Sequence, residues 1–410
     1  MLVRMERCVK SEPNSKFKVA MVVTRSMVED SSISRVRIMR SIQEIFEENF
    51  DTKVFRIYNL IDSRRVLDWV GMIWSSFLSL ISLRPIPLQC VLFSARSEIS
   101  RLVSEISAGQ YDIVYLDSVR NLQLLRALRK IRRRIRVVVD FDDLMSRRME
   151  MLADNGWPIS LGYLQNKVPR RIQGAIEGVL SGVIARYEAR SLRDIELEIC
   201  RRANVVVLVS PVECELLRGR LVSGAGADLR SVIPSRAVIT SEIRLRSPYR
   251  FVFIGSDVHG QNRLSIEYLV ELWRRLRPDA VLHIYGRQKS PPPKVHNIQW
   301  HGYVEDLRDV YSDDSIALLP ALRAGGIKTK MIEAWAFGRP VLANPMAFEG
   351  LSVQGYPLMV PELNWDSFIL APGVHREVWI TAADLGNSFV RRELSVERYT
   401  EQWLEIMRPN

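Results

Sequence analysis

Short apolar runs alternate along this chain with longer segments whose apolar residues recur every three to four positions. The short runs predict buried strands at 19–24, 111–116, 137–140, 205–210, 251–254, 281–285, 298–300, 316–319 and 341–343. The longer segments predict helices with one buried face at 33–46, 184–202, 265–276, 304–311 and 328–337, with two further amphipathic patches over 384–407. This alternation predicts an α/β protein built from doubly wound parallel sheets.

Length and patterning together predict two domains. A chain of 410 residues exceeds the size at which a single hydrophobic core stops growing. The regular pattern also lapses over 233–248, IPSRAVITSEIRLRSP, which indicates a linker. We therefore expect a flexible tail at 1–17, an N-terminal Rossmann-like domain at 18–232, a C-terminal Rossmann-like domain at 249–385 and a final helix at 386–410.

The stretch 315–351 carries the strongest indication of a binding site. Its strand ends at Pro320, Gly325 and Gly326 then permit positive φ, and a helix follows over 328–337. Lys328 and Lys330 lie in the first turn of that helix, where free N–H groups and the helix dipole already favour an anion such as phosphate.

Lys330 and Glu333 are three residues apart and share one helix face. In a binding site the lysine would neutralise phosphate while the carboxylate accepts hydrogen bonds from hydroxyl groups. The alternative is an ordinary ion pair on a solvated helix. The residues of this segment alone leave both interpretations open.

The pattern G-x-x-x-K-x-x-E-A-x-A-x-G-x-P-V over 326–341 is similar to the donor-site signature of family-4 retaining glycosyltransferases, which have the two-domain GT-B fold. The likeness extends to FVFIGS at 251–256, HIYG at 283–286, WHGYVEDLRDVYSDDSIALLP at 300–320 and FEGL at 348–351. In the first half, SSISRVRIMR, YDIVYL and VVVDFDDLMSRR resemble the sugar transferases of bacterial exopolysaccharide systems.

This resemblance implies two Rossmann-like domains facing a cleft, with the C-terminal helix returning to the first domain. It implies transfer of a sugar, with retention, from a nucleotide sugar such as a UDP- or GDP-sugar to a saccharide or lipid-linked acceptor. The leaving diphosphate would be stabilised by Lys330, Lys328 and Arg323, with no cofactor and no metal. Cell-surface polysaccharide or glycoconjugate synthesis is the implied setting.

The expected donor-binding residues lie at strand ends and around the glycine turn, because ligands of doubly wound sheets bind outside the carboxyl ends of strands. They are Gly255, Ser256, His259, Gly286, Arg287, Gly325, Gly326, Ile327 and Glu333. On the acceptor side the resemblance points to Arg35, Arg37, Asp143 and Ser146; the last two could instead cap a helix.

Two departures from the family pattern keep other functions open. The residue eight positions before Glu333 is Gly325, so the E-x7-E pair lacks its leading glutamate. The loop SDVHGQN also lacks the Arg and Lys that many family members direct at the diphosphate. A catalytically silent GT-B scaffold and a nucleotide-sugar epimerase of the same fold are the alternatives, although the acid–base set of an epimerase is not recognisable.

Several clusters of polar residues are compatible with other sites. Asp140, Asp142 and Asp143 could suggest a divalent cation, but the signature downstream belongs to a fold that generally neutralises diphosphate with protein groups. The five histidines show no chelating spacing, and the four cysteines form no C-x-x-C motif. We expect no metal and a reducing, cytoplasmic environment.

Charge raises the question of an anionic partner. The 58 Lys and Arg exceed the 47 Asp and Glu by 11. The helix expected after the strand 111–116 ends in the run 126–136, which holds seven basic residues. No nucleic-acid-binding motif accompanies them, so we do not expect nucleic acid as a partner.

The apolar run 69–83 would span only roughly 22 Å as a helix, too short for a bilayer, so it indicates a packed or an interfacial helix. With no apolar signal-peptide run near the start, a cytoplasmic protein, peripheral on the inner face of the plasma membrane, is a further expectation.

Overall fold

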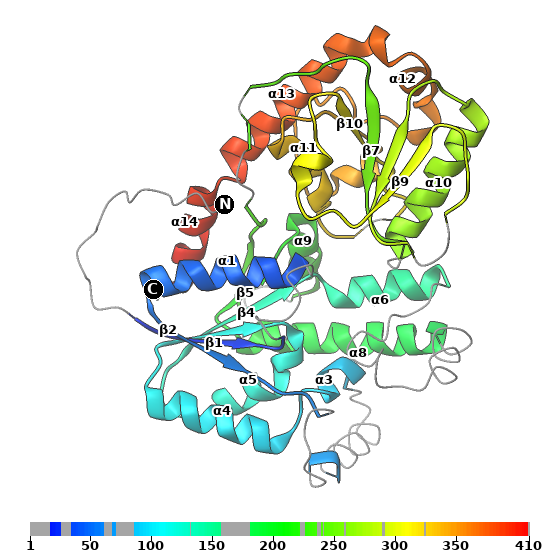
Figure 1. Cartoon of the computed structure of the whole chain (residues 1–410). Coiled ribbons are helices and arrows are strands. Elements are labelled where there is room, and N and C mark those ends of the chain that lie inside the picture. Colours follow the sequence, from blue (N-terminus) through cyan, green and yellow to red (C-terminus); the bar gives the residue numbers. More distant parts are fainter. Residues whose placement is uncertain are drawn as a thin grey trace.

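The computed structural model describes two α/β domains, one above the other in Figure 1, joined by a short linker. The described residues are 17–25, 34–60, 68–70, 86–131, 133–156, 181–221, 226–235, 239–240, 242–257, 260–288, 292–323 and 325–408. Each domain has its own parallel sheet, so the prediction of a two-domain α/β protein is confirmed.

The first domain contains a sheet of six parallel strands in the order β2-β1-β3-β4-β5-β6. Its strands are β1 (Lys18–Val23), β2 (Asp51–Arg56), β3 (Ile113–Asp117), β4 (Arg136–Asp142), β5 (Val205–Leu208) and β6 (Asp228–Ser231). The central strands are apolar and fully buried because helices cover both faces of the sheet. The order reverses between β1 and β3.

The helices of the first domain divide between the two faces of the sheet. They are α1 (Ser34–Asn49), α3 (Leu88–Val91), α4 (Arg96–Gly109), α5 (Leu122–Leu128), α6 (Met145–Asp154), α8 (Ser181–Arg202) and α9 (Pro211–Arg220), with a 3₁₀ turn η1 (Val119–Asn121). α1 packs on one face, and α4, α5 and α8 pack on the other. In Figure 1, α6 and α9 lie toward the second domain.

The second domain contains a sheet of five parallel strands in the order β11-β10-β7-β8-β9, which reverses between β7 and β10. The strands are β7 (Arg250–Ile254), β8 (Leu282–Tyr285), β9 (Ile298–Gly302), β10 (Ser315–Leu319) and β11 (Val341–Ala343). The helices are α10 (Gly260–Leu276), α11 (Thr329–Ala336), α12 (Asp366–Leu370) and α13 (Arg376–Glu393), with 3₁₀ turns η3 (Leu307–Asp309), η4 (Pro345–Phe348), η5 (Glu362–Asn364) and η6 (Pro372–His375).

The last helix, α14 (Val396–Met407), packs on the first domain although it follows the second in sequence. Trp403 contacts the rings of Phe46 and Tyr115 at centroid distances of 5.9 and 5.8 Å. The guanidinium of Arg136 donates to the carbonyl oxygen of Ile406 at 3.1 Å. The chain therefore passes between the domains twice, once through the linker and once between α13 and α14.

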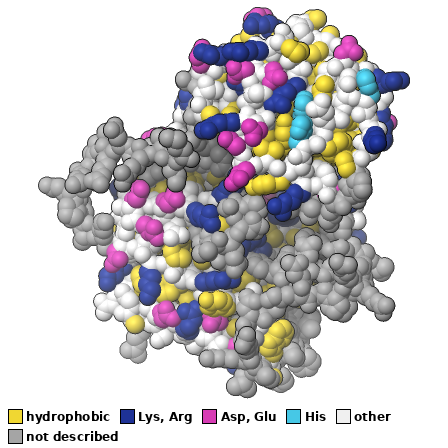
Figure 2. All heavy atoms as spheres, viewed as in Figure 1, with side chains coloured by type: hydrophobic (Ala, Val, Ile, Leu, Met, Phe, Trp, Pro, Cys, Tyr) yellow, Lys and Arg dark blue, Asp and Glu magenta, His cyan; other side chains and the backbone are white. Residues whose placement is uncertain are grey.

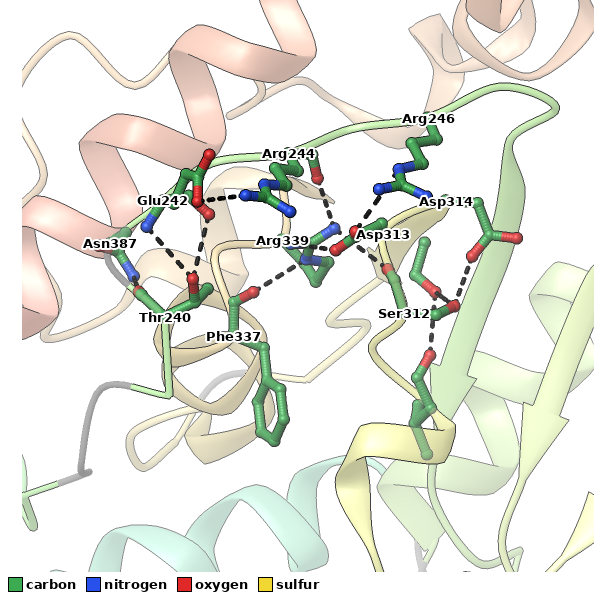
Figure 3. A network of polar contacts seen from close by, with 12 residues as sticks. Thr240, Glu242, Arg244, Arg246, Ser312, Asp313, Asp314, Phe337, Arg339 and Asn387 are labelled. Atoms are coloured by element: carbon green, nitrogen blue, oxygen red, sulfur yellow. Dashed lines mark hydrogen bonds and ion pairs between the residues drawn. The ribbon is translucent and has the colours of Figure 1, made fainter.

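The linker residues near 240–246 are fixed to the second domain by a buried arginine (Figure 3). Arg339 donates to the carbonyl oxygens of Arg244 at 2.7 Å and Ser312 at 3.1 Å, and pairs with Asp313 at 3.3 Å. Asn387 of α13 donates to the carbonyl oxygen of Thr240 at 2.9 Å. The end of the linker thus moves with the second domain.

Several local predictions need correction. The helix predicted at 304–311 is only the 3₁₀ turn η3, which is capped at its start by the Asp306 side chain accepting from Arg308 N. β2 and β6 were not predicted, since each is a short, largely polar strand at one edge of the sheet. α5 ends at Leu128, so most of the basic run 126–136 follows the helix and does not belong to it.

Most of the apolar run 69–83 lies outside the described residues. Within the ranges that the structure describes, no helix combines the length and the apolar character needed to cross a bilayer.

Candidate active site

The crevice of the second domain lies at the point where its strand order reverses, the place where doubly wound sheets bind ligands. Gly255 follows β7, Gly286 follows β8 and Pro320 follows β10. α11 begins beside these strand ends, and its N-cap residue, Lys328, makes no side-chain cap bond. Thr329 N donates to the carbonyl oxygen of Ile327 at 3.1 Å and Met331 N to that of Lys328 at 2.9 Å, so this start of α11 offers the crevice mainly the positive end of the helix dipole.

Lys330 lies at the floor of this crevice. Its Nζ donates to Asn262 Oδ1 at 2.6 Å and lies 4.6 Å from the centroid of the Phe253 ring. A Cβ atom at position 255 would stand 2.7 Å from that nitrogen, so Gly255 leaves the space that the lysine occupies. Burial lowers the pKa of Lys330 to about 7; the negative charge of Glu333 opposes this shift and Lys328 adds to it. An anion placed here would stabilise the charged lysine.

Glu333 is buried one turn farther along α11. It does not form a direct ion pair with Lys330, whose nitrogen is directed at Asn262. Burial raises the pKa of the Tyr311 hydroxyl well above its usual value, and the charge of Glu333 adds to the shift. The ion pair that the sequence left open as an alternative is therefore not the arrangement in the structure.

Asn262, in the first turn of α10, was not among the predicted site residues. Besides accepting from Lys330, its amide donates to the carbonyl oxygen of Ser256 at 3.0 Å. It therefore connects the loop after β7 to the lysine of α11. A usable signal for Asn262 was present in the sequence, because this residue follows a strand end within the loop SDVHGQN, at the start of a helix.

The two glycine-ended strands pack closely at the rim of the crevice. Gly286 has a φ of +130°, and a Cβ atom there would stand 2.4 Å from the carbonyl oxygen of Gly255. Ser256 Oγ donates to the carbonyl oxygen of Arg287 at 2.7 Å, and the guanidinium of Arg287 lies 5.1 Å from the centroid of the Tyr303 ring. The predicted residue His259 lies outside the described residues.

Lys328 and Lys330, predicted to act together, diverge in the structure. Lys328 Nζ donates to the carbonyl oxygen of Gly325 at 2.7 Å. Burial lowers its pKa, while the carboxylates of Glu349, Asp143 and Glu213 oppose that shift. Lys328 thus points toward carboxylates contributed by both domains, whereas Lys330 points into the crevice.

The remaining residues of the turn are also packed. Gly325 and Gly326 have φ values of +103° and +69°, conformations that glycine adopts without strain. Ile327 contacts the backbone at Gly350, where an added Cβ would stand 2.6 Å from Ile327 Cδ1. Arg323 is 8 % exposed, and burial together with the charge of Arg263 lowers its pKa to about 10.

In the first domain, Arg35 forms the centre of a buried ionic network where the sheet order reverses. Its guanidinium pairs with Asp117 at 2.7 Å, Asp140 at 2.9 Å and Asp142 at 3.1 Å. Burial raises the pKa of Asp142 to about 7 despite the opposing charge of Arg35. Thr24 Oγ1 also donates to Asp117 at 3.0 Å. Arg35 therefore has its full set of anionic partners within the protein.

The other predicted acceptor-side residues are placed differently from one another. Ser146 is buried and donates through Oγ to Glu196 at 2.6 Å. Arg37 is exposed on α1, and Asp143 is partly exposed at the start of α6. Leu144 is the N-cap of α6 and forms no side-chain cap bond, so the predicted capping by Asp143 or Ser146 is wrong.

The acidic run 140–143 is explained in part by this network, since Asp140 and Asp142 bind Arg35. Among the residues that the structure describes, no three His, Cys, Asp or Glu side chains are arranged to hold a metal ion.

Much of the basic run 126–136 is engaged in contacts within the protein. Four of its arginines have partners: Arg126 binds Glu198, Arg129 binds Asn204, Arg133 binds Asp112 and Arg136 binds the carbonyl oxygen of Ile406. Figure 2 shows basic and acidic side chains interspersed over both domains on the face in view. These contacts give the run a structural role.

Comparison with known proteins agrees with this geometry. Residues 248–371 match the family model described as Glycosyl transferases group 1, so the second domain is a glycosyl transferase group 1 domain. No curated protein sequence matches the chain.

Similar solved structures cover both domains. Sucrose-phosphate synthase from Thermosynechococcus elongatus has 15% identity and a TM-score of 0.59, over 95% of this chain and 98% of that one. HepE from Anabaena, in complex with UDP and glucose, has 12% identity and a TM-score of 0.58, over 95% and 98%. The lipopolysaccharide outer core galactosyltransferase WaaB has 13% identity and a TM-score of 0.54, over 95% and 99%. The predicted GT-B fold is confirmed.

Proposed function

We propose that this protein is a glycosyltransferase that moves a sugar from a nucleotide diphosphate donor to a hydroxyl group of an acceptor. The observation that carries the proposal is Lys330, a partly buried cation without a bonded carboxylate among the described residues. It lies where the strand order of the second sheet reverses, which is where sheets of this type bind ligands. The group 1 domain over 248–371 supports the same reaction class. HepE, of similar fold, binds UDP and glucose, which favours UDP as the nucleotide here.

In this proposal the residues of the crevice act on the diphosphate. Lys330 and the positive end of the α11 dipole stabilise the negative charge that develops on the leaving group. Gly255 leaves room for the Lys330 ammonium and Gly286 lets the two strand ends pack closely. Glu333 accepts hydrogen bonds from the ribose hydroxyls. Protein cations take the part that a metal ion plays in other transferases. Retention of anomeric configuration is proposed from the family resemblance.

The acceptor would bind between the domains. Arg37 and Asp143 are the predicted acceptor-side residues that retain solvent exposure. Ser146 is used within the first domain and Arg35 is paired with three carboxylates, so we assign both a structural part. A saccharide or lipid-linked acceptor in cell-surface glycan synthesis fits the resemblance of the first half.

Binding and hydrolysis experiments test the proposal. Calorimetry with UDP and GDP should show micromolar to millimolar binding of one of them, and Glu333→Gln should weaken it. Slow hydrolysis of a panel of nucleotide sugars would then identify the donor. Absence of binding to both nucleotides would contradict the proposal. Binding without hydrolysis or transfer would favour the silent scaffold, which the glycine at position 325 suggests.

Peripheral attachment to the inner face of the plasma membrane is the finer part of the proposal. It rests on Lys130 and Arg134 of the basic run and on the apolar run 69–83. Flotation with vesicles containing acidic lipid should show binding that weakens with salt. Absence of binding at low salt would contradict attachment and leave the transferase assignment intact.

A further inference from the structure

The glycine turn at Gly325 and Gly326, beside the donor crevice, is held by the carboxylate of Glu349. Glu349, directly after η4, accepts a hydrogen bond from Gly325 N at 3.0 Å through Oε2. Lys328 Nζ donates to the carbonyl oxygen of the same glycine at 2.7 Å. Both backbone polar groups of Gly325 are therefore bound by charged side chains, which fixes the turn that leads into α11.

The second oxygen of Glu349 binds the other domain. Arg147, in the first turns of α6, donates through Nη1 to Glu349 Oε1. The same nitrogen lies 3.7 Å from Glu213 Oε1, and Glu213 Oε2 accepts from Leu144 N at 3.0 Å, which fixes the start of α6. The side chains of Arg147 and Glu349 are 19 and 12 % exposed, so water screens their pairing only weakly.

The first domain also approaches the turn directly. A Cβ atom at Gly326 would stand 3.4 Å from Asp143 Oδ1, and one at Gly325 would stand 3.6 Å from Met151 Sδ. A Cβ at Gly350, next to Glu349, would stand 3.2 Å from Ser210 Oγ at the start of α9. The turn therefore packs between α6 of one domain and Glu349 of the other.

We propose that Glu349 is a positioning residue that couples the approach of the first domain to the shape of the donor turn. One carboxylate is shared between Arg147 and Gly325 N, so movement of α6 changes the position of Glu349 and with it the turn that leads to Lys330. This inference rests on the proposed transferase function for its kinetic consequence. Its structural part concerns only the two contacts.

Three substitutions separate the two contacts. Glu349→Ala removes both. Arg147→Met removes the contact between the domains together with the approach of Arg147 to Glu213 within the first domain. Glu349→Gln keeps an acceptor for Gly325 N while removing the charge that binds Arg147. We expect kcat to fall about 100-fold in Glu349→Ala, the scale of a small misplacement of reacting groups. In Arg147→Met and in Glu349→Gln, kcat should fall about 10-fold. The double variant should have a kcat no lower than that of either single variant. The Kd for UDP should change less than about threefold, because Lys330 and Asn262 do not contact Glu349.

Asp366→Asn serves as the matched control. It breaks the pair between Arg275 and Asp366, which has two contacts of 2.7 Å within the second domain and lies away from the turn. Turnover in this variant should equal that of the wild type. Wild-type turnover in Arg147→Met, or a loss in Glu349→Ala matched by an equal loss of folded protein, would overturn the coupling.

Hydrogen exchange gives a second measurement that does not depend on activity. The peptide containing Gly325 should exchange faster in Arg147→Met than in the wild type or in Asp366→Asn, although Arg147 belongs to the other domain. Unchanged exchange would overturn the proposal. If the wild type transfers no sugar from any donor, the proposed function fails, and the exchange result still decides whether Glu349 couples the domains.

Discussion

Each of the two sheets places a basic side chain where its strand order reverses, and the two side chains differ in their partners. Arg35 in the first domain binds Asp117, Asp140 and Asp142. Lys330 in the second domain donates to the neutral amide of Asn262 and lies over the Phe253 ring. Desolvation disfavours both charges, but only the first is compensated by carboxylates of the protein.

This difference separates a structural cation from one that is available to a ligand. Carboxylates around Arg35 hold its pKa well above its usual value in spite of burial, whereas burial lowers the pKa of Lys330 to about 7. A cation with surplus carboxylates has no need of an anion from solution. A cation without them gains when a diphosphate arrives, which supports the proposal that the second domain binds the donor.

The largest expected effect follows from replacing Arg35, the cation that is paired with carboxylates of the protein. Arg35→Met would leave Asp117 and Asp140 buried without their cation, and breaking a buried pair in this way typically costs about 3 to 5 kcal/mol. Urea unfolding should show that loss in the first domain. UDP affinity should stay close to that of the wild type, since the donor crevice lies in the other domain. Unchanged stability would show that the network is not what holds these strand ends together.

Replacing Lys330, the cation without a bonded carboxylate, should lower turnover without destabilising the fold. Lys330→Met should lower turnover about 100-fold or more, because one electrostatic stabiliser of the leaving group is lost. Without ligand, the Lys330→Met variant should be more stable than the wild type below pH 7. In that range the wild-type lysine is charged in the folded state without a bonded carboxylate. Activity and melting temperature measured together test both expectations. A parallel fall in the two would instead indicate that Lys330 stabilises the fold.

The smallest expected effect is the number of protons that the protein takes up when a diphosphate binds. A bound diphosphate should raise the pKa of Lys330 from about 7 toward its ordinary value, so at pH 8 binding should take up roughly one proton. At pH 6 the lysine is already mostly charged and uptake should be small. Affinity should therefore fall as pH rises above 7. Calorimetry in buffers of different ionisation enthalpy measures the uptake, and Lys330→Met should abolish it. Equal uptake in that variant would assign the proton to another group.

The sequence predicted the elements better than the contacts between them. Buried strands such as 113–117 were found because continuous apolar runs mark strands covered on both faces, and the strand-end rule placed Gly255 and Lys330 in one crevice. The edge strand Asp228–Ser231 was missed because it carries little apolar signal. Residues two apart at a helix start do not face each other, which accounts for the divergence of Lys328 from Lys330.

Contacts between distant parts of the chain could not be predicted in this way. Arg35 reaches Asp142 across 107 positions, and Arg147 reaches Glu349 across 202. No local pattern specifies such a pair, because its geometry depends on how the sheets and domains pack. The sequence showed these residues only as charges on helices and loops.

The path of α14 has a consequence for how the chain acquires its structure during synthesis. Tyr399, Trp403, Ile406 and Met407 belong to the same apolar core as the first strand and α1. The rings of Phe46 and Tyr115, which contact each other, therefore lack their shared partner Trp403 until residues 396–407 have left the ribosome. The first domain to be translated thus completes its core only after the second has been made. A nascent chain halted before α14 should expose an apolar surface that chaperones recognise.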